Sequence, residues 1–114
     1  MSMPDDDTAA ALRRFVAEGS DLGRPMEMDF FVAVPDEAIG RAVVARIAPL
    51  GFKTSVEQDD ETGQWTCYCT ITIVPQYATV VSVETQLDAI ARPLGGYADG
   101  FGSYGNANPS KGDT

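Results

Sequence analysis

Residues 26–35 read MEMDFFVAVP, a run in which two sets of side chains alternate. The first set is strongly apolar and the second more polar; they comprise Met26, Met28, Phe30, Val32 and Val34, and then Glu27, Asp29, Phe31 and Ala33. Because successive side chains of a strand point to opposite faces, this pattern predicts a strand with one apolar face. Such a face needs a covering layer, and the proline that follows favours a helix start.

A second run with the same alternation occupies residues 65–74, WTCYCTITIV, and is again followed by a proline. Its less polar face carries Trp65, Cys67, Cys69, Ile71 and Ile73, and its other face Thr66, Tyr68, Thr70 and Thr72. The polar segment QDDETGQ, residues 58–64, predicts a hairpin that joins this strand to a modest strand over residues 52–58.

Three segments carry apolar residues at helical spacing. The first helix is expected from about residue 7 to 18, the second from Pro35-Asp36-Glu37 to Pro49, and the third to end near Ala91, before Pro93. Their apolar positions are Leu12, Phe15 and Val16; Ile39, Ala42, Val43, Ile47 and Leu50; and Val80, Val83, Leu87, Ile90 and Leu94.

Similar sequences occur at the ends of two predicted strands and of two predicted helices. Val34-Pro35 is echoed by Val74-Pro75, and IAPLGF at residues 47–52 by IARPLGGY at residues 90–97. Two strand-helix-strand halves predict an α+β, ferredoxin-like βαββαβ sandwich, with two helices on one face of a four-stranded antiparallel sheet and an extra N-terminal helix. The first and third strands are then central. We expect one domain over residues 1–106 and a flexible tail over residues 107–114.

The amino-acid composition disfavours several classes of function. The 114 residues include 17 acidic and 8 basic side chains, a formal charge of −9, and no histidine. This charge disfavours general nucleic-acid binding and suits a basic partner. The absence of histidine removes the usual general base and the commonest metal ligand. The N-terminus MSMPDDDTAA lacks a basic, apolar leader, so we expect a cytoplasmic protein without membrane segments.

Several residues admit both a structural and a functional interpretation. Cys67 and Cys69 suit buried packing better than a zinc pair or a reactive thiol, and the acidic hairpin is either a solvated turn or a contact for a basic partner. The open sheet face carries Phe31 and Tyr68, which the N-terminal helix, a second subunit, another protein or RNA could cover. A small enzyme would instead need Asp29, Glu57 or Asp99 in a pocket.

The C-terminal segment YADGFGSYGN, residues 97–106, alternates aromatics with glycines. It is either a bulged edge strand that packs its own rings or a recognition edge. We predict partner binding here, with contact area from the rings, a polar group from the acid and close backbone access from the glycines. The residues are Tyr97, Asp99, Gly100, Phe101, Gly102 and Tyr104, and no catalytic residue, metal ligand or cofactor is predicted.

At these residues the chain resembles the regulators of ribonuclease activity of the B type, the RraB family. The likeness spans roughly residues 19–106 and rests on the Gly51-Phe52 turn, on Trp65 after an acidic hairpin, and on Tyr97-Ala98-Asp99-Gly100-Phe101-Gly102-Ser103-Tyr104. Phe101 stands where a tryptophan is expected. The resemblance implies a ferredoxin-like, non-catalytic protein that binds an RNase E-type endoribonuclease and dampens RNA cleavage. A homodimer paired through the open face remains an alternative.

Overall fold

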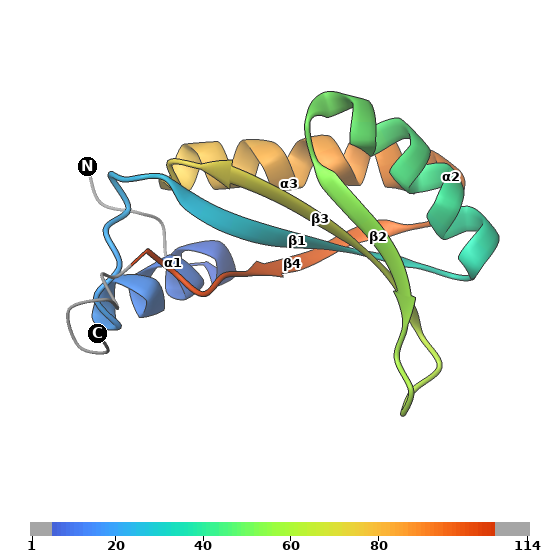
Figure 1. Cartoon of the computed structure of the whole chain (residues 1–114), viewed down its shortest axis with the longest axis horizontal. Coiled ribbons are helices and arrows are strands. Elements are labelled where there is room, and N and C mark those ends of the chain that lie inside the picture. The colour runs from blue at the N-terminus through green and yellow to red at the C-terminus, as the bar shows by residue number, and fades with distance from the viewer. Residues whose placement is uncertain (1–5, 107–114) are drawn as a thin grey trace.

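The computed structural model describes residues 6–106 and has the predicted α+β architecture (Figure 1). The elements are α1 (Asp7–Ala17), β1 (Met26–Val34), α2 (Glu37–Ile47), η1 (Ala48–Leu50), β2 (Lys53–Gln58), β3 (Trp65–Ile73), α3 (Tyr77–Ala91), η2 (Arg92–Leu94) and β4 (Tyr97–Gly102). Residues 97–102 of the C-terminal segment form a bulged edge strand, as predicted. The tail predicted over residues 107–114 lies outside the described residues.

The four strands form one antiparallel sheet in the order β2-β3-β1-β4. The first and third strands are therefore central, as the ferredoxin-like prediction requires. Their pairing runs without interruption from Met26 opposite Ile73 to Val34 opposite Trp65. This register places the apolar sets of the two strands on the same face, which α2 and α3 cover (Figure 1).

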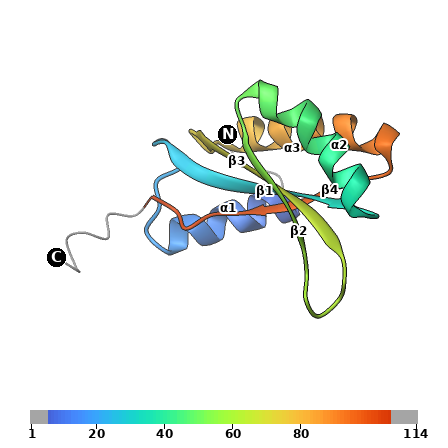
Figure 2. The same ribbon diagram turned by 45° about the vertical axis from the view of Figure 1, so that its right-hand side comes forward.

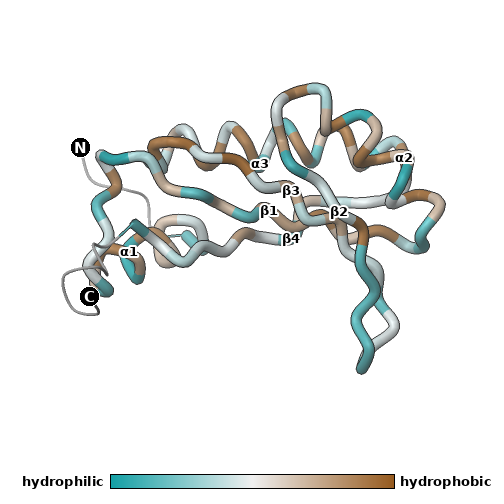
Figure 3. The backbone as a smooth tube through the Cα atoms, in the orientation of Figure 1, coloured by the Kyte–Doolittle hydropathy of each residue, from teal (hydrophilic) through white to brown (hydrophobic). Residues whose placement is uncertain are grey.

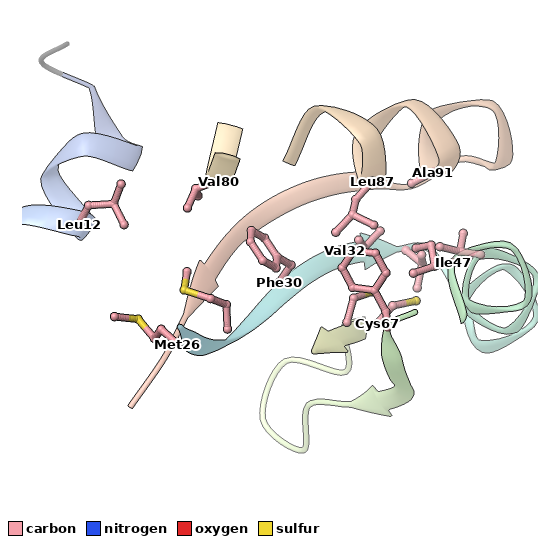
Figure 4. Close-up of a cluster of buried hydrophobic side chains, with 14 of the residues drawn as sticks. Leu12, Met26, Phe30, Val32, Ile47, Cys67, Val80, Leu87 and Ala91 are labelled. Carbon is pink, nitrogen blue, oxygen red and sulfur yellow. The ribbon is translucent and has the colours of Figure 1, made fainter. Parts of the chain in front are cut away.

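The core lies between that face and the helices (Figure 4). Its fully buried side chains come from both central strands and both helices and include Met28, Phe30, Val32, Cys67, Val43, Ile47, Val80 and Leu87. Two predicted core positions are wrong: Val16 is 50% exposed and Leu50 is 46% exposed. Val16 lies off the Ala9, Leu12 and Phe15 stripe that α1 buries, and Leu50 sits in the short η1 turn.

The placement of α1 differs from one alternative weighed for the open face. Phe15 of α1 contacts Phe101 of β4, with ring centroids 6.2 Å apart, and Phe101 is paired directly with the core residue Phe30. Directly paired residues share a face, so α1 packs on the helix side of the sheet. It lies beside β4 (Figure 2). A hydrogen bond of 2.9 Å from the Thr8 hydroxyl to Glu84 also fastens α1 to α3. The interpretation that α1 covers the open face is wrong.

Both cysteines are free and fully buried, which confirms the predicted packing role. Burial raises the pKa of the Cys67 thiol to about 11 and, together with the neighbouring Cys67 charge, that of Cys69 to about 12. An unfolded thiol has a pKa of about 8.5. Because the folded values are higher, the stability that the neutral thiols contribute is intact below that pH and is lost as pH rises toward the folded values.

We therefore expect a maleimide reagent near neutral pH to label the native protein slowly, at a rate set by unfolding. Mass spectrometry would follow both thiols over time, and Ser55→Cys, on an exposed position of β2, would supply a rapidly labelled control thiol. Labelling of Cys67 or Cys69 as fast as the control thiol would contradict the burial of these side chains.

Candidate protein-binding surface

The sheet face opposite the helices is uncovered within residues 6–106. We call it the open face and define it by Lys53, Ser55 and Glu57 of β2, Thr66, Tyr68, Thr70 and Thr72 of β3, Glu27, Asp29, Phe31 and Ala33 of β1, and Tyr97, Asp99 and Gly102 of β4. These side chains lie on the same face for two reasons. Residues that pair directly across neighbouring strands share a face, and so do residues two positions apart along one strand. Asp99, next to the irregular pairing of β4, lines one depression with Ala33, Thr66 and Tyr97.

An aromatic pair lies at the centre of this face. Phe31 and Tyr68 are directly opposite each other on β1 and β3, and their rings meet edge to face with centroids 5.4 Å apart. Gly102 of β4 leaves room for the Phe31 ring, because a Cβ atom there would lie 3.3 Å from it. Phe31 is thus supported on both sides, while Tyr68 remains 37% exposed.

Carboxylates surround the aromatic pair. Within the open face, Glu27, Asp29, Glu57 and Asp99 are acidic and Lys53 is basic. The Thr70 hydroxyl donates a hydrogen bond of 2.5 Å to Asp29, and the Ser55 hydroxyl donates one of 3.2 Å to Glu57. The face therefore carries a net negative charge around an apolar centre.

The hairpin between β2 and β3 extends this charge beyond the sheet. It projects away from the helices and is strongly hydrophilic (Figures 1 and 3). Asp59 accepts hydrogen bonds from the Thr62 hydroxyl and backbone N–H at 2.7 and 2.9 Å, which hold its pKa below the ordinary value. Asp59 thereby stabilises the turn, whereas the exposed Asp60 and Glu61 have side chains available to solvent or a partner.

The six C-terminal residues predicted to bind a partner divide between the surface and the interior. Tyr97 is 45% exposed with the Arg92 guanidinium 5.7 Å from its ring centre, and Tyr104 is fully exposed. Gly100 has a φ of +103° in the β4 irregularity, a conformation that favours glycine. Phe101 packs into the core against Phe15 and Phe30.

Side-chain hydrogen bonds that no sequence pattern indicated hold the chain after β4. The Asn106 side chain accepts a hydrogen bond of 2.7 Å from the Asp21 N–H and donates to the backbone carbonyls of Asp21, Arg24 and Pro25 at 2.9 to 3.1 Å. The Ser103 hydroxyl donates to the Glu27 carbonyl at 2.6 Å. Ser103 and Asn106 therefore fix the backbone on both sides of the exposed Tyr104. Their partners lie far away in the sequence, so no local motif predicts these hydrogen bonds.

A family model described as Regulator of ribonuclease activity B matches residues 5–103. The chain belongs to the RraB family. This membership confirms the resemblance, and the match begins before α1, so the N-terminal helix belongs to the family domain. Among curated proteins, none matches this chain.

The acidic residues considered for an enzyme do not meet in this RraB family protein. Asp29, Glu57 and Asp99 line three different shallow depressions of the open face. General acid–base catalysis needs such groups within reach of one substrate. In residues 6–106, no three Cys, Asp or Glu side chains group as metal ligands, and no helix has the length and apolarity to cross a membrane.

Proposed function

We propose that this RraB family protein is a non-catalytic regulator that binds an RNase E-type endoribonuclease and lowers its cleavage of RNA. The observation that carries the proposal is the acidic open face, uncovered within residues 6–106, in a chain that belongs to a family of ribonuclease regulators. The protein would act in the cytoplasm, bind no nucleic acid directly and need no cofactor.

The negative charge of the protein explains how binding would lower RNA cleavage. Segments that bind RNA are basic because they neutralise phosphates. A protein with a formal charge of −9 is attracted to the same segments, and its carboxylates compete with RNA for them. Complementary charge speeds encounter and disfavours partners of the wrong sign, so binding alone is sufficient to reduce cleavage.

The C-terminal signature and the open face would form one contact surface. Tyr97, Asp99 and Tyr104 are exposed and would contact the ribonuclease directly. Gly100 and Phe101 would act by fixing β4, and Gly102 by seating Phe31.

The test measures ribonuclease binding and RNA cleavage with the full-length protein at low and moderate salt. We expect Asp99→Asn combined with Tyr97→Ala to weaken binding about tenfold and to relieve inhibition in proportion. Glu18→Gln removes an exposed charge just after the C-terminal end of α1, outside the open face, and should change neither quantity. Binding that is insensitive to salt, or cleavage of RNA by the protein itself, would refute the proposal.

A further inference from the structure

Tyr68 separates two shallow depressions along β3. One, of about 260 Å³, is lined by the carboxylates of Glu27 and Asp29 and by Lys53, beside Thr70 and Tyr68, so its charged groups sum to −1. The other, of about 410 Å³, is lined by Glu57 and the acidic hairpin residues 59–61 beside Thr66 and Tyr68. The exposed ring at the centre of the open face therefore has carboxylates on both sides along the strand.

This arrangement matches the chemistry of arginine. A guanidinium group is planar and always charged, stacks on aromatic rings, and pairs with carboxylates through two parallel hydrogen bonds. Phe31 holds the Tyr68 ring from the neighbouring strand, so a stacking partner meets a ring that is already placed. In either depression, a guanidinium group could therefore stack on the Tyr68 ring and pair with a carboxylate.

The charges also select the class of partner. RNA would bring phosphates against these carboxylates, which repel them. A second copy of this chain would bring the same carboxylates, with Lys53 as the basic residue of its open face. A basic protein segment avoids both repulsions and has the apolar side-chain stems to cover the aromatic pair.

We propose that the open face binds an extended protein segment that lies along β3 and places one arginine in each depression, with its middle over Tyr68. This inference rests on the proposed function, because the segment would belong to the ribonuclease. The depressions lie at Thr66 and Thr70, four residues apart, or about 14 Å at the rise of an extended strand. The two arginines are therefore four positions apart in the partner.

The test uses two synthetic peptides of identical composition, one with arginines four positions apart and one with the arginines adjacent. Fluorescence anisotropy would measure their binding to the full chain. We expect the first peptide to bind about fivefold more tightly, and Tyr68→Ala to remove about fivefold of that affinity while Tyr68→Phe retains it. Val16→Ala removes an exposed apolar side chain on α1, outside the open face and the C-terminal signature, and serves as the matched control.

Equal affinity of the two peptides, or full binding by Tyr68→Ala, would overturn the inference. So would preferential binding of single-stranded RNA or self-association blocked by Tyr68→Ala. If Tyr68→Ala fails to fold, Glu57→Gln at an exposed position provides the same comparison, with an expected loss of about threefold. If the peptides fail while ribonuclease inhibition remains sensitive to Asp99→Asn, the inference falls and the proposed function stands.

Discussion

Phe101→Ala is expected to lower the free energy of unfolding by about 3 kcal/mol and the melting temperature by about 10 °C or more. The Phe101 ring lies between Phe15 of α1 and Phe30 of β1, with centroids 6.2 and 5.7 Å away. Its removal would leave a cavity where β4, α1 and the central sheet meet, and these elements come from distant parts of the chain. Urea denaturation and calorimetry would measure the loss.

Tyr104→Ala is the matched comparison within the same signature. Its side chain is fully exposed, so we expect the free energy of unfolding to change by less than about 0.5 kcal/mol. Capture of the ribonuclease, corrected for the folded fraction, should weaken for Tyr104→Ala although its stability is unchanged. Unchanged stability of Phe101→Ala would show that this ring does not hold β4 to the core.

The signature thus combines two physical tasks in a few residues. Phe101 anchors β4 from the core side, and Tyr97 and Asp99 are exposed on the open face of the same strand. Asp88 of α3 accepts the Ala98 N–H at 2.9 Å, which further fixes the strand and holds the pKa of Asp88 below its ordinary value. A change at an interior position can therefore disturb the surface without any contact with the partner.

The alternation in β1 and β3 was sufficient to predict the sheet and its two faces. Burial alternates without a break along β1, and in the middle of β3 the two cysteines are buried while Tyr68 between them is exposed. The register keeps both apolar sets on one side. The central position of Phe31 and Tyr68 follows from the same periodicity, because both belong to the second set of their strand.

The side of the sheet that α1 covers could not be predicted in this way. In a strand of strict alternation, Phe101 would lie three positions after Ala98 and therefore face the opposite side. The structure instead places Asp99 and Gly100 opposite the single residue Phe31, and this extra residue turns Phe101 toward the core. Because Phe15 contacts Phe101, the irregularity also determines where α1 packs. A positive φ at Gly100 is the local signal, and the sequence shows only a glycine there.

The repeated helix ends hold one asymmetry that predicts the second large effect. Gly51 and Gly95 are equivalent residues that follow η1 and η2, with φ values of +105° and +102°. The next residue is Phe52 in the first half and Gly96 in the second. A Cβ atom at Gly96 would lie 2.7 Å from the Ala33 carbonyl oxygen and 3.0 Å from Val34, so β4 can pair with β1 at this point only because Gly96 has no side chain.

We expect Gly96→Ala to lower the free energy of unfolding by about 3 kcal/mol, because the clash is with backbone that is itself paired in the sheet. Gly51→Ala and Gly95→Ala should each lower it by about 1 kcal/mol, the cost of the left-handed conformation, since a Cβ atom would meet nothing within 4 Å at Gly51 and only Pro35 at 3.8 Å at Gly95. Urea denaturation of the three variants provides the comparison. Since Gly96 precedes Tyr97, the displaced strand should also weaken ribonuclease binding in the molecules that fold. If Gly96→Ala lowered the free energy of unfolding no more than Gly51→Ala, β4 could shift relative to β1 without cost, and the close contact at Gly96 would not fix the position of Tyr97.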